Sequence, residues 1–560
     1  MRQISKYIFT TMIIKRFISS VLVLLLAVVS FQAASKSVSA SVAQETANNF
    51  MKSHYKASSM LFKAPAKADF VLAHAEPLEK QPSVNAYYIF NIKGGGFIIV
   101  SGEDRAIPVL GYCDNGRIDI NNIPEPLREL LDIYKADIDY LLTHKTIKTS
   151  NSNNRGYGDA VNVVEPMLKT SWGQQEPYNI LCPILKGKYS KTGCSAVAMA
   201  QTVYFWRFPT SCDTLPPYYA SRLSDTVPAF PATVFDFDKM LPSYSHWDFD
   251  NQVLVQDTYT DEEALAVAEL TRFCGHSVMM NYSPASSGPQ TNRPAALRNM
   301  GYNPDSHTIY RKYYTDEKWL SLLKGDLSAG IPVMYTAYNK GSDVGHVFML
   351  DGYDSEDYFH INFGWFGHGN GWYQISAIVL TYLDGTPRNY IGNNSFIIGL
   401  EPPLFCTIDA EVGASSGLHL LGETLTALAS DVKLSMSYRT LPFMFSLTDA
   451  DGGQVALSES ITLNRLTFEN GSDISLALTL PETLPEGVYD LHLNYLTGDN
   501  DPLTQALTAT GQLYVLGKFA KYGTPFGIAD VVEVIDMILQ ENPQVNIADV
   551  TMLIDHMLAN

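Results

Sequence analysis

Basic residues are scarce in this chain: 39 Lys and Arg stand against 58 Asp and Glu, which gives a formal net charge of −19. No basic cluster stands out, so no nucleic-acid partner is expected. Charged residues amount to only 17% and hydrophobic residues to 46%, a balance that argues against long disorder and favours several packed cores. At roughly 100–200 residues per domain, the 560 residues predict three or four domains.

Cysteine is also sparse, with six residues in 560. No two of them have the CxxC spacing and the chain has no HExxH motif, so we expect no metal site and no cofactor. Cysteines scattered in this way do not make a disulfide scaffold, although one or two disulfides remain open. The six are Cys113, Cys182, Cys194, Cys212, Cys274 and Cys406.

Long apolar runs are absent except near the N-terminus, where residues 17–31 are dominated by Val, Leu and Ala. Basic residues precede this run, and small residues follow it at Ala33, Ala34 and Ala40. Such flanks are typical of a signal peptide, which we assign to residues 1–40; an uncleaved membrane anchor is the alternative. We therefore expect a protein that is secreted or at the cell surface, with no membrane span in its mature form.

Residues 41–155 combine helical and strand patterns. Helices are predicted over 42–55 and 124–142, and a hairpin over 86–100 around three consecutive glycines. The polar stretch 146–159 predicts an exposed linker that proteases can cut. An α+β unit ahead of a cleavable joint fits a propeptide, and it equally fits an ordinary N-terminal domain.

The remaining chain changes character twice. Residues 156–400 are rich in aromatics, Gly and Pro, with a helix predicted over 261–274 and consecutive antiparallel strands over 332–375. Residues 401–517 show period-two alternation between turn signals, which predicts an all-β sandwich of the immunoglobulin type. Residues 518–560 hold a small repeat, Ile-Ala-Asp-Val at 528–531 and again at 547–550, which predicts two similar helices.

The stretch Lys191–Trp206 carries the first chemical signal. A Thr-Gly pair ends a loop, and a run of Ala, Val and Met without Gly or Pro follows, which predicts a buried helix with Cys194 in its first turn. Backbone N–H groups and the helix dipole lower the pKa of a thiol there, and a thiolate is the nucleophile of a cysteine enzyme. The simpler interpretation of such a cysteine is a small buried hydrophobe.

A base for this thiol is found in Gly345-His-Val-Phe-Met-Leu-Asp-Gly352. His346 opens a predicted strand 152 residues after Cys194, an order and a separation that suit a papain-like arrangement. The imidazole would hold the thiolate as an ion pair and later protonate the leaving amine. Three other histidines are interpreted as structural residues: His276, His360 and His368.

Acyl transfer also needs hydrogen-bond donors for the oxyanion. The backbone N–H of Cys194 is one candidate. The side-chain amide of Gln174 is the best-placed second donor, with its neighbour Gln175 as the alternative. Asn362 and Trp365 would orient and cover the histidine from the next strand, although ordinary packing and turn formation explain both equally well.

With these residues in view, the chain resembles the streptopain family of papain-clan cysteine peptidases over residues of about 165–375. The N-terminal unit resembles the inhibitory prodomain of that family, most closely over residues 95–112. The motifs occur in family order: Trp172-Gly-Gln-Xaa-Xaa-Pro-Tyr-Asn179, Thr192-Gly-Cys-Xaa-Ala-Xaa-Ala-Met-Ala-Gln201, Met280-Asn-Tyr-Ser-Pro284, Gly345-His-Val-Phe-Met-Leu-Asp-Gly-Tyr353 and Phe359-His-Ile-Asn-Phe-Gly-Trp365.

The resemblance implies roles for individual residues. The implied roles are Cys194 as the nucleophile, His346 as the base, Gln174 as the oxyanion residue, Trp365 as the ring that packs on the histidine, and Ser287 and Gly345 as substrate-lining residues. The family usually has Trp where Phe363 stands and Gly where Ser283 stands. These departures imply a different cover over the histidine and an altered subsite.

The C-terminal repeat resembles a dockerin, although a degenerate one. Dockerin loops bind calcium through several Asp or Asn ligands, and the loops here, residues 518–526 and 540–545, offer few carboxylates. We expect paired helices without strong calcium binding, with a docking or retention role.

These observations predict an α+β chain: an inhibitory prodomain at 41–155, a papain-like peptidase domain at 156–400, a β-sandwich at 401–517 and the degenerate dockerin-like repeat at 518–560. The predicted function is a secreted cysteine endopeptidase made as a zymogen, with polypeptide substrates and its own prodomain as intramolecular inhibitor. One alternative is a non-catalytic surface binding protein on a peptidase-like scaffold. Another is a transglutaminase-like or amidase use of the same two residues.

Overall fold

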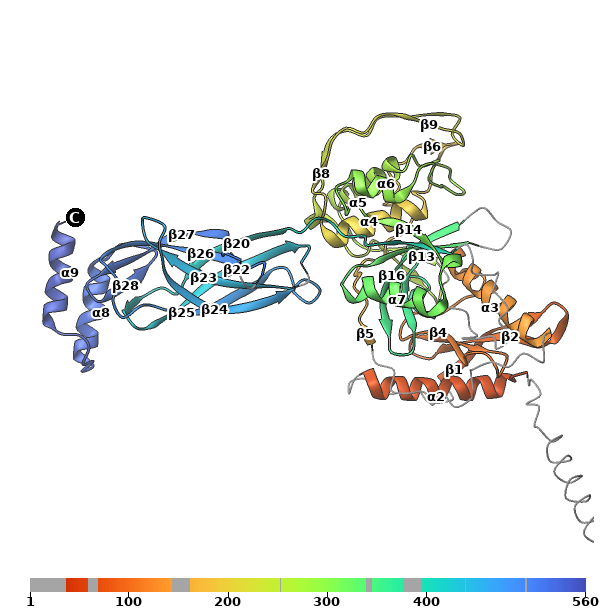
Figure 1. Ribbon diagram of the computed structural model, residues 1–560, viewed down its shortest axis with the longest axis horizontal. Coiled ribbons are helices and arrows are strands. Elements are labelled where there is room, and N and C mark those ends of the chain that lie inside the picture. Colours follow the sequence, from red (N-terminus) through yellow and green to blue (C-terminus); the bar gives the residue numbers. More distant parts are fainter. Residues whose placement is uncertain are drawn as a thin grey trace, which may run out of the picture.

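A computed structural model describes residues 37–58, 69–143, 162–251, 253–338, 345–375, 394–438, 440–498 and 501–559. The apolar run assigned to a signal peptide and the linker over 146–159 lie outside these residues. A mixed α/β body occupies one end of the molecule, and a β-rich unit extends from it and ends in two helices (Figure 1). Among the described helices, none combines the length and the apolarity needed to cross a membrane.

One sheet of 11 strands forms the centre of the α/β body. The predicted hairpin over 86–100 and the consecutive antiparallel strands over 332–375 are confirmed within it. The order across the sheet is β1 (Phe70–Leu78), β2 (Gln81–Ile92), β3 (Phe97–Ser101), β4 (Val109–Cys113), β18 (Gly371–Gln374), β17 (Tyr358–Asn362), β16 (Gly345–Asp354), β15 (Val333–Tyr338), β19 (Ser395–Ile398) and β14 (His307–Tyr310), with β5 (Asn162–Val164) paired to β16.

The sheet crosses from the N-terminal unit into the next one between β4 and β18, where Tyr112 lies opposite Trp372 and Gly111 opposite Tyr373. A Cβ atom on Gly111 would lie 2.6 Å from the Tyr373 ring, so this close approach requires glycine. The Tyr134 hydroxyl donates to the Gln374 carbonyl at 2.7 Å and so stabilises the contact between α3 (Glu125–Thr143) and β18. The sequence patterns predict two separate compact units here, whereas the backbone hydrogen bonds join them into one sheet.

Two helices cover opposite faces of the N-terminal strands: α2 (Ala40–Ser58) and α3 (Glu125–Thr143). Side chains alternate between the faces of a strand, so Tyr88 and Phe90 pack with α2 whereas Tyr87 and Ile89 pack with α3. Both helices match the predicted ones within a few residues. The apolar stripe of α3 is buried, and its N-terminal turn lies beside β16.

A second core surrounds α4 (Cys194–Trp206), α5 (Asp261–Ser277) and α6 (Arg293–Asn299). The helix predicted around Cys194 is confirmed, and its Ala, Val and Met residues are buried on all sides. The other elements of the body are α7 (Asp316–Ser328), η2 (Phe237–Lys239), η3 (Arg311–Tyr313), β6 (Ile184–Leu185), β7 (Lys188–Tyr189), β8 (Ser211–Cys212), β9 (Tyr218–Ala220), β10 (Asp225–Val227), β11 (Thr233–Val234), β12 (Ser245–Asp248) and β13 (Val253–Gln256).

The β-rich unit has two sheets that enclose a third core, in which Leu425 and Ala427 of one sheet meet Phe443 and Leu491 of the other. The immunoglobulin type stays a prediction. The smaller sheet is β20 (Cys406–Ala414), β22 (Thr424–Met436) and β25 (Ser472–Thr479); the larger is β21 (Leu418–Leu420), β28 (Phe519–Tyr522), β27 (Thr504–Leu516), β26 (Gly487–Tyr495), β23 (Thr440–Thr448) and β24 (Gln454–Asn464).

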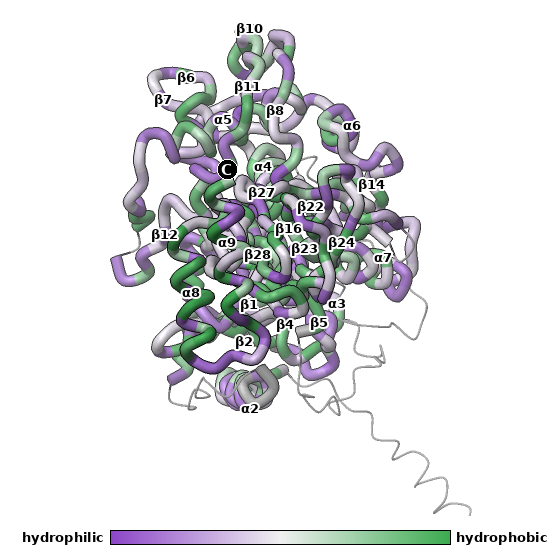
Figure 2. The backbone as a smooth tube through the Cα atoms, turned by 90° about the vertical axis from the view of Figure 1, so that its left-hand side faces the viewer, coloured by the Kyte–Doolittle hydropathy of each residue, from purple (hydrophilic) through white to green (hydrophobic). Residues whose placement is uncertain are grey.

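Two helices, α8 (Ile528–Leu539) and α9 (Ile547–Ala559), end the described chain. Val534 and Leu553 are fully buried and pack with Phe519 of β28 in a small separate core. Figure 2, which views the molecule from this end, shows hydrophobic residues along both helices. Their identity as a dockerin-like module stays a prediction.

Candidate active site

Cys194 is the first residue of α4, and Gly193 is its N-cap with a φ of 90°. A Cβ atom on Gly193 would lie 2.9 Å from the Met280 side chain and 3.0 Å from the Ser287 carbonyl, so only glycine fits this turn. The sharp turn places the Cys194 side chain at the helix N-terminus, where it stays partly exposed while the residues after it are buried. This is the environment in which a thiolate is stabilised.

The Cys194 thiol and the His346 ring perturb each other. Burial works to raise the pKa of Cys194, but contact with His346 and its charge, the Val347 N–H and the charge of Arg293 outweigh burial and lower that pKa. Burial works to lower the pKa of His346, but Cys194 and two nearby carboxylates outweigh it and raise that pKa. The two shifts together favour a thiolate–imidazolium pair.

The other cysteines behave differently. All six are free, and burial raises the pKa of Cys113, Cys182 and Cys406 to about 12. Such thiols are poor nucleophiles at neutral pH. In the described part of the chain, no group of three or more His, Cys, Asp or Glu side chains is placed to hold a metal ion.

Helix α3 of the N-terminal unit reaches the same histidine. His346 Nε2 lies 3.6 Å from Glu125 Oε1 and 3.5 Å from Glu129 Oε1. Burial raises the pKa of Glu129 to about 7, with the charge of His346 working against that rise. Neither ring nitrogen of His346 is within hydrogen-bonding geometry of a described residue. The interaction of His346 with Glu125 and Glu129 is therefore electrostatic.

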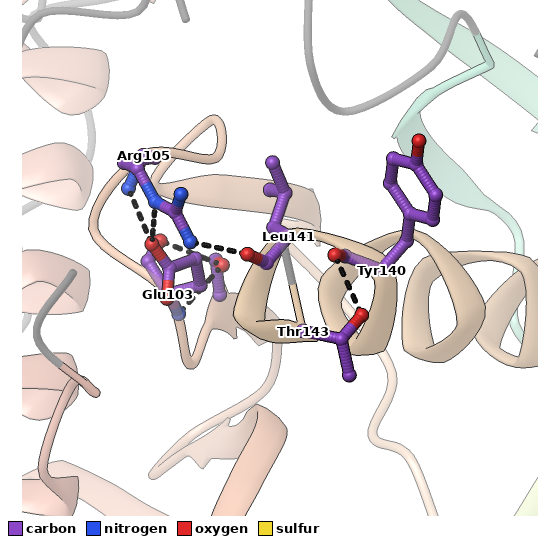
Figure 3. Close-up of polar contacts among 6 residues, drawn as sticks. Glu103, Arg105, Tyr140, Leu141 and Thr143 are labelled. Atoms are coloured by element: carbon purple, nitrogen blue, oxygen red, sulfur yellow. Dashed lines mark hydrogen bonds and ion pairs between the residues drawn. The ribbon is translucent and has the colours of Figure 1, made fainter. Parts of the chain in front are cut away.

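The far end of α3 is anchored by Arg105 (Figure 3). Its Nη2 donates to the Leu141 carbonyl at 2.5 Å, and its Nε donates to Glu103 Oε1 at 2.5 Å. A cation at the C-terminal carbonyls of a helix is favourable for its dipole. Glu103 is fully buried, so this ion pair fixes α3 against the sheet while its other end lies at His346.

Two more predicted residues hydrogen-bond to the loop that leads to Cys194. Gln174 is buried, and its backbone carbonyl accepts a hydrogen bond from Thr192 N at 3.1 Å. Ser287 Oγ donates to the Lys191 carbonyl at 2.7 Å. Gly345 begins β16 directly before His346. The fold therefore brings these predicted residues to the two segments that carry the thiol and the imidazole.

The predicted neighbours of the histidine are placed less directly. Asn362 Nδ2 donates to the Thr170 carbonyl at 2.6 Å, and its Oδ1 accepts from Gly364 N at 3.0 Å, so its amide is engaged with the backbone. Trp365 packs between the two large cores, with Lys191 Nζ 5.4 Å from its ring centre. Within the described residues, neither side chain has a hydrogen bond or ring contact with the histidine.

The three histidines interpreted from the sequence as structural all have partners within the fold. His360 Nδ1 lies 2.6 Å from Asp351 Oδ1. His276 Nε2 lies 2.7 Å from the Pro216 carbonyl. His368 stacks on Trp247 with ring centres 5.1 Å apart. These contacts agree with their interpretation as structural residues.

Sequence reasoning missed three charged residues at the site. Glu125 and Glu129 lie four residues apart on α3, a spacing that puts them on one helix face but does not say what that face meets. Arg293 donates to Ser195 Oγ at 3.2 Å and to Thr336 Oγ1 at 2.8 Å. The sequence around Arg293 does not predict a role at the site, because both of its acceptors are distant in sequence.

Comparison with known proteins finds two family models that match separate parts of the chain. Residues 172–373 match the Peptidase C10 family, and residues 35–138 match the Spi protease inhibitor family. Streptopain of Streptococcus pyogenes serotype M28 is 27% identical over 344 residues, which are 56% of this chain and 80% of that protein. The thiol protease/hemagglutinin PrtT of Porphyromonas gingivalis is 26% identical over 384 residues, 65% of this chain and 42% of that protein.

Two solved structures from Prevotella intermedia are also similar. A prointerpain A fragment is 27% identical, with a TM-score of 0.46, over 58% of this chain and 98% of that one. Active interpain A, a cysteine protease, is 30% identical, with a TM-score of 0.35, over 42% of this chain and 94% of that one. On these sequence matches, the chain belongs to the Peptidase C10 family and is a cysteine peptidase that carries an inhibitor-like N-terminal domain.

Proposed function

We propose that this chain is a secreted cysteine endopeptidase made as a zymogen, with Cys194 as the nucleophile and His346 as the base. The support is the pair of opposite pKa shifts at the two residues, lowered for the thiol and raised for the imidazole. That combination favours the thiolate over the thiol, and the thiolate is the species that attacks a peptide carbonyl.

The proposed reaction passes through an acyl-enzyme. The Cys194 thiolate attacks the carbonyl carbon, and the backbone N–H of Cys194 and the Gln174 amide stabilise the oxyanion. His346 then protonates the leaving amine, and later takes a proton from the water that hydrolyses the thioester. Ser287 and Gly345 would line the substrate cleft. Asn362 and Trp365 would hold the loop that follows β17 in place. Asn362 bonds to the Thr170 carbonyl, and the Trp365 ring contacts Lys191 in the loop before Cys194.

Latency is proposed to come from α3. The observation that carries it is the position of Glu129 Oε1 and Glu125 Oε1, 3.5 and 3.6 Å from His346 Nε2. A helix held at that distance occupies space that a substrate needs next to the histidine. Cleavage in the linker over 146–159, which connects α3 to β5, would free this helix.

The domain limits predicted from sequence are proposed unchanged: a signal peptide at 1–40, a prodomain at 41–155, a peptidase domain at 156–400, a β-sandwich at 401–517 and a terminal repeat at 518–560. A docking role of the repeat is proposed from its exposed apolar side chains, of which all but Val532 recur at equivalent positions of both helices. They are Ile528, Val532, Ile535 and Leu539 on α8, and Ile547, Ile554 and Leu558 on α9.

The test is casein hydrolysis by the purified full chain in reducing buffer, beside Cys194→Ala, with gels that follow the precursor. We expect the wild type to shorten itself and digest casein while the variant stays full length. Digestion by Cys194→Ala at the wild-type rate would exclude Cys194 as the nucleophile. Absence of digestion by the wild type after removal of its N-terminal unit would exclude general endopeptidase activity.

A further inference from the structure

Arg293 lies at the candidate active site without belonging to any of the recognised motifs. It is the first residue of α6, and the helix is capped by the Asn292 side chain. Its Nη1 donates to Ser195 Oγ at 3.2 Å and its Nη2 donates to Thr336 Oγ1 at 2.8 Å. Ser195 and Thr336 are 1% and 2% exposed, so the guanidinium reaches into the protein to make both bonds.

The two acceptors belong to the two halves of the site. Ser195 directly follows Cys194 in the first turn of α4. Thr336 lies on β15 opposite Val347, the residue that follows His346 on β16. One planar side chain therefore links the element that carries the thiol with the strand next to the one that carries the imidazole. A guanidinium suits this role because its donors have a fixed fork geometry.

We propose that Arg293 is a positioning residue of the peptidase reaction, which holds the first turn of α4 against β15 and so sets the Cys194 sulfur against the His346 ring. This inference rests on the roles proposed for Cys194 and His346. It assigns to α6, a helix outside the recognised motifs, a part in the geometry of the reaction.

The charge of Arg293 adds to this role. The groups that act on the Cys194 thiol are His346, the Val347 N–H and Arg293, while Glu125 and Glu129 act on His346 from α3. The imidazole loses its positive charge when it protonates the leaving amine, whereas a guanidinium stays charged throughout. Arg293 thus gives the sulfur a cation that does not change during the reaction.

The test compares Arg293→Met and Arg293→Lys with wild type, with Arg298→Met as the matched control. Arg298 is on the same helix but donates to the Ser306 carbonyl, away from both halves of the site. The first readout is the pH dependence of iodoacetamide alkylation of the full chain, quantified on the Cys194 peptide by mass spectrometry. The second is kcat and KM on a peptide substrate after self-processing.

We expect Arg293→Met to raise the apparent pKa of Cys194 by about 0.5–1 unit and to lower kcat about tenfold with little change in KM. Arg293→Lys keeps the positive charge but loses the two-pronged donor geometry of the guanidinium. It should therefore leave the pH dependence of Cys194 alkylation unchanged and lower kcat about threefold. Arg298→Met should change neither. A wild-type alkylation curve and wild-type kcat in Arg293→Met would overturn the proposal.

Two further variants are used if circular dichroism shows that Arg293→Met does not fold. Ser195→Ala and Thr336→Val each remove one acceptor, and each should lower kcat about threefold. Unchanged kcat in both would overturn the proposal. Failure of the proposed function shows separately, because Cys194→Ala would then retain hydrolysis whatever the Arg293 variants do.

Discussion

Glu129 Oε1 lies 3.5 Å from His346 Nε2, although the first belongs to the inhibitor-like N-terminal domain and the second to the segment that matches the peptidase family. The carboxylate is buried beside the imidazole, and Glu125 lies 3.6 Å from the same nitrogen. Two acidic groups at this nitrogen stabilise the protonated ring and fill the space beside it. Charge and occupation of the site therefore act together in the uncleaved chain.

Replacing the exposed carboxylate, as Glu125→Gln, should weaken the hold of α3 on the site. The amide keeps the size of the side chain but loses the attraction to the imidazolium, so the helix should leave the site more often. We expect self-processing of the full chain to become about two- to fivefold faster, as measured by the loss of precursor on gels.

Asp139→Asn is the matched control, because it removes a carboxylate from the same helix without a contact to His346. Its processing rate should equal that of wild type. Equal rates for Glu125→Gln and the control would mean that the Glu125 carboxylate does not contribute to latency.

The docking of α3 should weaken as pH rises. Burial raises the pKa of Glu129 from 4.5 to about 7, whereas the pKa of His346 is raised, against the effect of burial, chiefly by Cys194, which lies beside it whether or not α3 is docked. The docked state therefore binds more protons than the free one, so its advantage is full at pH values below about 4.5 and declines as pH rises through 7. Latency should accordingly be tighter at pH 5.5 than at pH 8.

Hydrogen exchange of the α3 amides measures this directly, in a Cys194→Ser full chain that does not process itself. After correction for intrinsic exchange, protection should fall between pH 5.5 and pH 8. Glu129→Gln should show a smaller fall, because the group whose pKa burial raises to about 7 is gone. Protection that rises with pH would contradict the assigned direction.

The local part of the site was predictable from the sequence, and the tertiary part was not. Cys194 and His346 each stand in a short pattern, a Gly-capped apolar helix and a Gly-led strand, so their elements were predicted correctly. The pairing of β4 with β18 joins residues such as Tyr112 and Trp372 that are distant in sequence, and no local signal specifies it. Glu129 has the pattern of an exposed charge on a helix, and only packing against β16 gives it a partner.

Arg105 should matter for latency although it is remote from His346. Arg105→Met removes the donor to the Leu141 carbonyl and leaves Glu103 buried without its ion-pair partner. Breaking such a pair costs about 3 kcal/mol, less here to the extent that Glu103 takes up a proton, since burial already raises its pKa. We expect a lower melting temperature and faster self-processing.

Arg128→Met is the control for Arg105→Met, because Arg128 is exposed on α3 and donates to the Ile120 carbonyl at the surface. Its melting temperature should stay close to that of wild type. If both variants melt and process alike, the anchor shown in Figure 3 does not hold α3 in place.

The reactivity of Cys194 should depend on His346 more than on the helix N-terminus. In His346→Ala, burial still works to raise the pKa of Cys194, while the largest opposing contribution is lost. Alkylation of Cys194 by iodoacetamide at pH 7 should therefore slow at least about tenfold, as quantified by mass spectrometry of the Cys194 peptide.

His307→Ala, at an exposed histidine bonded to the Asp305 carbonyl, should leave the rate unchanged. Cys182, whose pKa is raised to about 12, should stay unreactive in every variant and so reports any loss of folding. An unchanged Cys194 rate in His346→Ala would show that α4 alone activates the thiol, and the base would have to be sought elsewhere.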